Sequence, residues 1–128
     1  MKTGKCACKG DFLDRFIQPE ILMLLCGQPM HGFSILKEYN RRTGVAGAID
    51  PTGLYRTLKK MEENGLLASD LDTMSTSKPR RIYSVTSEGL SCLARWRTTL
   101  AEYRDSIGRL QKDIETKLSE QGCVIDDQ

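Results

Sequence analysis

The sequence predicts a mainly α-helical protein that carries one small β-hairpin. Three observations predict it. A capped helix with a basic outer face begins at Asp50, two short strands around a polar loop follow it, and a long helix with heptad spacing closes the chain. A helix of this kind followed by a charged hairpin is the arrangement of a winged helix-turn-helix. We therefore expect a winged helix-turn-helix with a long C-terminal dimerisation helix.

Four segments are expected along the 128 residues. Residues 1–16 form an N-terminal extension with a Cys-x-Cys pair, and residues 17–86 form the winged helix-turn-helix domain. Residues 87–118 form the C-terminal dimerisation helix, and residues 119–128 form a flexible tail. A chain of this length fits one compact domain with one accessory element.

Two helices are expected before the capped one. Pro19 favours the start of a helix, so the first helix begins there and ends at Gly27. Its nearly continuous apolar sequence predicts a buried core helix. The second helix runs from about Met30 to Arg42, and Gly44 stands where a positive φ is expected past its end. Its inner face is predicted to consist of Phe33, Ile35, Leu36 and Tyr39.

The third helix begins with a strong start signal. Asp50 can cap the free N–H groups, and Pro51 suits the first turn. The helix is expected to end at Asn64, and two strands follow over residues 66–72 and 80–86. The apolar stripe of the helix consists of Leu54, Leu58 and Met61.

The two strands and the polar loop between them form the wing. Because side chains alternate along a strand, Arg81, Tyr83 and Val85 share one face of the second strand. The positive charge of the wing comes from Lys78, Arg80 and Arg81, which we expect to contact the DNA backbone or the minor groove. The alternative is a hairpin that is merely soluble.

The final helix is expected to start at a Thr86 or Ser87 cap, with Glu88 in its first turn. Its apolar residues recur at spacings of three and four, which is the seam of a coiled coil. So long a stripe exceeds what a small domain can cover, so we predict a homodimer. The seam consists of Leu93, Trp96, Leu100, Tyr103, Ile107, Leu110, Ile114 and Leu118.

The charge is distributed unevenly, although the net charge is only +2. Residues 31–86 hold nine Lys/Arg against six Asp/Glu, whereas residues 87–128 hold six against eight. The positive excess falls on the elements expected to meet phosphates. No apolar run approaches the roughly 18 residues that span a bilayer, and the N-terminus lacks a signal-peptide pattern. We therefore expect a cytoplasmic protein without membrane contact.

The outward face of the third helix has the composition of a DNA-reading surface. Entry into the major groove requires outward side chains near the N-terminal half of such a helix. Arg56 is expected to bond a guanine edge. Thr52, Tyr55 and Lys59 are expected to position the protein on phosphates, and Gly53 would let the backbone approach one. The alternative is the solvated basic face of an ordinary helix.

His31 is the only histidine and invites a metal or acid–base role. Its place at the start of the second helix instead favours capping or packing. No second histidine, paired carboxylates or nucleophile arrangement supports catalysis, so we predict that the protein is not an enzyme and requires no cofactor.

Cys6 and Cys8 lie one residue apart between lysines, and neighbouring positive charge favours the thiolate. The pair could therefore sense a metal or an oxidant. The pair supplies only two of the four ligands of a structural zinc site. The alternative hypothesis is a disordered tail that senses no signal. Cys26 and Cys92 lie on apolar helical faces and are expected in the core.

Three ordered stretches of the chain resemble the PadR family of bacterial transcriptional regulators. They are PEILMLLCGQPMHGFSILKEYNRRTG, DPTGLYRTLKKMEENGLLASD and KPRRIYSVTSEGLSCL, and they cover about residues 17–95. The resemblance implies a dimer of winged helix-turn-helix domains joined by a C-terminal helix, usually a repressor that a small molecule releases. The single C-terminal helix looks like the smaller branch of the family. The N-terminal extension departs from the family pattern, so a zinc or thiol signal competes with a small aromatic effector.

Trp96 is the lone tryptophan and lies early in the seam. It is expected to be an aromatic residue of the dimer core. The alternative, which the resemblance supports, is that it lines a cavity between subunits and stacks on a planar ligand.

The function predicted from these features is a sequence-specific DNA-binding transcriptional regulator that acts as a dimeric repressor. The alternative is a winged-helix module that binds a protein partner, or senses redox state or metal, without binding DNA. Fold alone does not decide between them.

Overall fold

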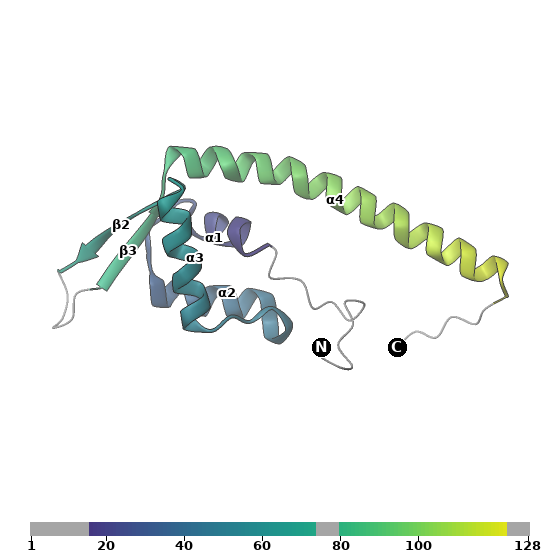
Figure 1. The fold of residues 1–128 in the computed structure, drawn as a ribbon, viewed down its shortest axis with the longest axis horizontal. Helices are drawn as coiled ribbons and strands as arrows, with labels where there is room; N and C mark the ends of the chain where they lie inside the picture. Colours follow the sequence, from purple (N-terminus) through teal and green to yellow (C-terminus); the bar gives the residue numbers. More distant parts are fainter. Residues whose placement is uncertain (1–15, 74–79, 123–128) are drawn as a thin grey trace. The chain divides into compact units, whose positions relative to one another are not determined.

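The computed structural model describes residues 16–73 and 80–122 (Figure 1). In chain order the elements are α1 (Ile17–Leu25), β1 (Met30–His31), α2 (Gly32–Gly47), α3 (Pro51–Glu63), β2 (Leu67–Asp72), β3 (Arg80–Val85) and α4 (Ser87–Glu120). The predicted fold class, a winged helix-turn-helix followed by a long helix, is confirmed. The chain divides into two compact units, one ending at Leu93 and the other beginning at Ala94.

The sheet has three antiparallel strands in the order β1–β3–β2. The hairpin of β2 and β3 agrees with the prediction, and its two strands run side by side in Figure 1. Strand β1 was not predicted, because the sequence pattern placed Met30 and His31 at the start of the second helix. These two residues pair instead with Tyr83 and Ile82 of β3. A strand of two residues shows no alternation in sequence, so only its partner strand reveals it.

Helix boundaries differ from the predictions by a few residues. Helix α1 begins at Ile17, so Pro19 lies within its first turn rather than at its first position. Gly44 has a φ of 74°, and this non-helical residue interrupts the segment assigned to α2. The positive φ expected at Gly44 is therefore confirmed. Helix α3 ends at Glu63, with Asn64 as its C-cap.

The core of the first unit lies between the three short helices and the inner face of the sheet. Its buried apolar residues include Ile21, Leu22, Leu25, Ile35, Leu36, Tyr39, Leu54, Leu58, Met61, Leu67 and Tyr83. The assignment of Phe33 to this core was wrong, because 57% of that residue is exposed. It occupies the first turn of α2, immediately after β1, and points away from the side that Ile35 and Tyr39 bury.

The two described cysteines also differ from expectation. Cys26 is exposed, because it is the C-cap of α1 and lies beyond the last turn that packs. Cys92 is half-buried, and its thiol lies 3.7 Å from the side-chain oxygen of Gln18. The prediction of a core position was therefore wrong for Cys26.

Helix α4 begins at the predicted cap. The N–H of Gly89 donates to the hydroxyl oxygen of Thr86 at 2.9 Å, and that hydroxyl donates to the carbonyl of Gly65 at 2.7 Å. Glu88 occupies the first turn, as predicted. The helix continues to Glu120, beyond the expected end.

The predicted seam of α4 is largely uncovered within one chain. Its exposed apolar residues are Tyr103, Ile107, Leu110, Ile114 and Leu118. None of the helices in the described ranges combines the length and apolar character needed to cross a membrane.

Candidate nucleic-acid interface

Helix α3 begins with the predicted cap. The carboxylate of Asp50 accepts the N–H of Gly53 at 2.9 Å, and Pro51 occupies the first turn. A Cβ atom at residue 53 would lie 2.9 Å from Asp50 Oδ1 and 3.1 Å from Ile49 Cγ1. The local structure therefore explains why residue 53 is a glycine, because a side chain there would crowd the cap.

The predicted DNA-reading residues lie on one exposed face of α3. Leu54 and Leu58 are fully buried on the opposite side, which fixes the orientation of the helix. The outward side chains are those of Thr52, Tyr55, Arg56 and Lys59, and all four residues are exposed. Within the described residues, neither Arg56 nor Lys59 forms an ion pair. Their charge is therefore available to an external anion.

Tyr55 connects this face to the start of α2. Its ring lies against Gly32, where an added Cβ would stand 2.9 Å from the phenol oxygen. The next residue is the exposed Phe33, and the Lys37 ammonium lies 5.5 Å from the centre of its ring. The aromatic and cationic surface thus extends from α3 onto the first turns of α2. Neither Phe33 nor Lys37 was predicted to belong to it.

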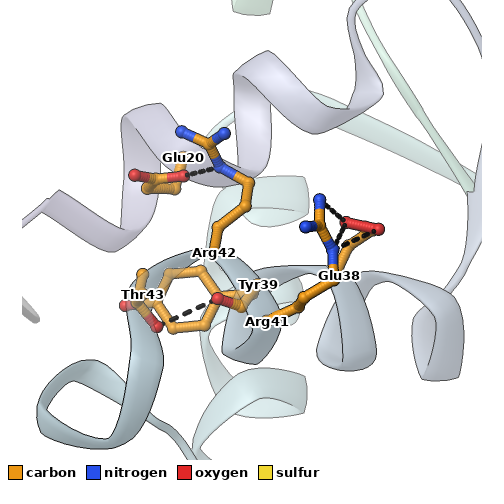
Figure 2. Close-up of polar contacts among 6 residues, drawn as sticks. All are labelled: Glu20, Glu38, Tyr39, Arg41, Arg42 and Thr43. Carbon is orange, nitrogen blue, oxygen red and sulfur yellow. Dashed lines mark hydrogen bonds and ion pairs between the residues drawn. The ribbon is translucent and has the colours of Figure 1, made fainter.

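The remaining cations of α2 are neutralised within the chain (Figure 2). Arg42 reaches across to α1 and donates to Glu20 at 2.9 Å. Arg41 donates to both oxygens of Glu38, at 2.9 and 3.0 Å, and this interaction lowers the pKa of the Glu38 carboxyl. The end of α2 therefore adds little net charge to the surface formed by α3.

The C-terminal part of α2 is also closed by a local hydrogen bond. The hydroxyl of Thr43 donates to the carbonyl oxygen of Tyr39 at 2.9 Å, as Figure 2 shows. The side chain of Asn40 then holds the loop before α3, because it accepts the N–H of Ile49 at 2.8 Å and donates to its carbonyl at 3.0 Å. These contacts fix the approach of the chain to the cap of α3.

The two described arginines of the wing lie on opposite faces of β3. Both are exposed, but only Arg81 has a partner in the described residues, since its guanidinium donates to the Ser69 hydroxyl at 2.8 Å. That hydroxyl donates in turn to Glu62 of α3 at 2.8 Å. Neither Ser69 nor Glu62 was predicted as a site residue. Lys78, the third predicted cation of the wing, lies outside the described residues.

Tyr83 lies beneath this set of polar groups and is buried. Burial raises the pKa of its phenol, the neighbouring Arg81 lowers it, and Glu62 and Tyr55 raise it further. The buried Tyr83 thus lies on the same face of β3 as Arg81.

His31 joins the two outer strands of the sheet. Its Nε2 lies 2.8 Å from Oδ2 of Asp72, at the wing end of β2, and both side chains are largely covered. This pairing agrees with the packing role favoured from the sequence. Among the residues that the structure describes, no three His, Cys, Asp or Glu side chains are grouped as metal ligands would be.

The other predicted sites fall in different parts of the chain. Cys6 and Cys8 lie outside the described residues. Trp96 and Leu100 are half-buried on α4, in the second unit. Leu93, the first residue of the seam, is half-buried at the end of the first unit.

Signals for the missed residues were weak. Lys37 is one cation on a helix whose other cations pair internally, and an exposed Phe33 cannot be separated from a core aromatic by spacing alone. Ser69 and Glu62 meet only when β2 folds back along α3, which local sequence patterns do not encode.

Comparison with known proteins matches the part of the chain that forms this surface. The sequence profile of the transcriptional regulator PadR-like family matches residues 21–95. The probable transcriptional regulator Rv1176c of Mycobacterium tuberculosis is 28% identical over 76 residues, which are 59% of this chain. The match spans 40% of the length of that relative.

Solved structures share the fold. A PadR family transcriptional regulator from Eggerthella lenta superposes with a TM-score of 0.72 and 28% identity, covering 82% of this chain and 90% of that one. Bacillus subtilis PadR, solved in complex with operator DNA, gives a TM-score of 0.58 at 22% identity and covers 84% of this chain and 73% of that one.

Proposed function

The chain belongs to the PadR-like family of transcriptional regulators, and we propose that it is a homodimeric repressor that a small-molecule or thiol signal releases from DNA. As a member of this family it is a regulator and not an enzyme. A cytoplasmic location is part of the proposal, because a transcriptional regulator works where its DNA lies.

One observation carries the DNA-binding part of the proposal. The recognition helix α3 presents Arg56 and Lys59 on its exposed face, and neither has an ion-pair partner among the described residues. Exposed cations on the outward face of such a helix are suited to phosphates and guanine edges in a major groove. The operator complex of Bacillus subtilis PadR supports duplex DNA as the partner.

We propose a specific DNA contact for each exposed residue of this surface. We assign a guanine edge to Arg56, and phosphates to Thr52, Tyr55 and Lys59. From the wing, we assign the DNA backbone or the minor groove to Arg80, and the sequence-based assignment of Lys78 to the same contact is kept. Lys37 adds a phosphate contact where Tyr55 meets the start of α2, because the first helix of a helix-turn-helix crosses the DNA backbone.

The dimeric part of the proposal is supported by the exposed stripe of α4. Ile107 is 62% exposed, and Leu110 is 61% exposed, in a single chain. Residues of this kind at heptad spacing are normally covered by a second helix. A second copy of the chain would bury them and would place two recognition helices on neighbouring half-sites.

The signal is proposed from two places in the chain. Trp96 is half-buried near the start of the stripe, where a planar ligand could stack on its ring between subunits. Cys6 and Cys8 offer two thiols to zinc or an oxidant. Quenching of Trp96 fluorescence by planar aromatics tests the first site, and release of DNA by zinc or oxidant in wild type but not in a Cys6→Ser/Cys8→Ser variant tests the second.

Fluorescence anisotropy with a labelled duplex from upstream of its own gene tests DNA binding. Arg56→Ala and Lys59→Ala should each weaken binding at least tenfold. The matched control is Lys112→Ala, which also removes an exposed cation, on the side of α4 away from the stripe. Wild-type affinity should fall steeply with salt, with a slope of about −0.9 for each phosphate contact.

The same measurement separates this function from its rival. A winged-helix module that binds only a protein partner would show no preference for its upstream duplex over unrelated DNA. Unchanged affinity in both Arg56→Ala and Lys59→Ala would contradict the proposed reading surface.

A further inference from the structure

A chain of two hydrogen bonds connects the wing to the recognition helix. The guanidinium of Arg81 donates to the Ser69 hydroxyl at 2.8 Å, and that hydroxyl donates to a carboxylate oxygen of Glu62 at 2.8 Å. The three residues come from β3, β2 and α3 in turn. A hydroxyl can serve both bonds at once, because it has one proton to donate and lone pairs to accept.

Strand register places the relay on the inner face of the sheet. Ser69 pairs with Tyr83, and Leu71 pairs with Arg81. Directly opposed residues share a face, so Arg81 and Ser69 are diagonal neighbours on the same side as the buried Tyr83. Strand β2 contacts α3. The side chain of Arg81 thus belongs to the face that meets the recognition helix.

Arg80 provides the contrast. It is the adjacent residue of β3, so its side chain leaves the opposite face of the sheet. It is exposed and has no ion-pair or side-chain hydrogen-bond partner within the described ranges. Two neighbouring arginines of the wing therefore have different environments. One is open to an external phosphate, and the guanidinium of the other is hydrogen-bonded to Ser69, which donates in turn to Glu62.

We propose that Arg81, Ser69 and Glu62 form a positioning relay that holds the wing at a fixed angle to the recognition helix, and that Arg81 acts in DNA binding through this relay rather than as a phosphate contact. The inference rests on the proposed DNA-binding function. An interface that must meet the major groove and the backbone together loses affinity when one of its two elements can swing.

The test compares relay variants with Arg80 in operator binding over a range of salt concentrations. Arg81→Met, Ser69→Ala and Glu62→Gln should each weaken binding about three- to tenfold, as expected when one hydrogen bond is removed, without changing the salt slope. Ser69→Thr keeps the hydroxyl and should bind like wild type. Arg80→Met should reduce the magnitude of the salt slope by about 0.9 for each phosphate that the arginine neutralises.

The energetic coupling between Ser69 and Arg81 gives a second test of the relay. The Ser69→Ala/Arg81→Met double variant should bind no more weakly than Arg81→Met alone, because both changes break one relay. A salt slope that falls in Arg81→Met as it does in Arg80→Met would overturn the proposal, as would unchanged affinity in Ser69→Ala. Tighter binding by Glu62→Gln would also overturn it, because Glu62 would then act only by repelling DNA.

Amide hydrogen exchange tests the relay without DNA. Relay variants should speed exchange at the wing ends of β2 and β3, where Asp72 pairs with Arg80, and Arg80→Met should not. If the wild type binds no duplex but these exchange rates rise as expected, the proposed function fails and the structural coupling stands. Unchanged exchange in all three relay variants would refute the coupling itself.

Discussion

Gly89, in the first turn of α4, lies directly against the main-chain carbonyl of Leu66, so that an added Cβ would collide with that oxygen. The same atom would stand 2.6 Å from Cγ2 of Val85. The hydroxyl of Thr86 closes the contact, because it also lies 3.1 Å from the Leu66 carbonyl. The base of the wing thus packs against the start of α4 so closely that position 89 has no room for a side chain.

Gly89→Ala should therefore destabilise the protein. The backbone cannot move aside easily, so overpacking should cost about 1–3 kcal/mol in the free energy of unfolding. Gly108→Ala is the matched control, because nothing lies within 4 Å of its added Cβ and alanine favours a helix by about 1 kcal/mol. Urea denaturation should show opposite signs for the two variants, and equal stabilities would contradict the close contact.

Asp50→Ala should destabilise α3. It removes the acceptor for the N–H of Gly53, and the loss of such a cap costs about 0.5–2 kcal/mol. Asp50→Asn keeps a capping oxygen and should remain close to wild type. Thermal denaturation followed by circular dichroism measures both. A loss as large in Asp50→Asn would show that charge, and not capping, matters at this position.

Ile107→Glu should convert the proposed dimer to monomers. Each dimer would lose two buried isoleucines, at about 2 kcal/mol each, which corresponds to roughly a thousandfold weaker association. Thr116→Glu introduces the same charge on an exposed residue outside the stripe and should leave the dimer intact. Sedimentation equilibrium gives the dissociation constants, and a wild type that stays monomeric at all concentrations would remove the dimer proposal.

Alkaline pH should destabilise the protein through Tyr83. Burial raises the pKa of this phenol above its ordinary value of about 10, so the folded state holds the proton more tightly than the unfolded state. The resulting stability is present below about pH 10 and is lost as the pH rises through the raised pKa. Tyr83→Phe lacks this proton, so its free energy of unfolding should fall less between about pH 9 and pH 11. An equal fall in both proteins would exclude Tyr83 as the cause.

Sequence patterns predicted the elements that carry repeated or local signals. Asp50 and Pro51 correctly predicted the start of α3, and the stripe of Leu54, Leu58 and Met61 correctly predicted its buried face. Each of these depends on residues within a few positions of one another. The fold class followed because helix, hairpin and final helix all had such local signals.

Features formed between distant segments were not predictable in the same way. Met30 and His31 form strand β1 only by pairing with β3, a distant segment of the chain. The exposed Phe33 follows this strand, in the first turn of α2. The pairing of Arg81 with Ser69 depends on the register of the hairpin. An arginine in a wing looks the same in sequence whether its charge is open or already engaged.

The apolar stripe on α4 has a consequence for gene control. Dimers held by this stripe, as proposed, would dissociate on dilution, so below the dissociation constant their number would grow with the square of the chain concentration. Promoter occupancy would then respond steeply to small changes in copy number per cell. The strength of the proposed helix pairing would thereby set the expression level at which the regulated gene is switched.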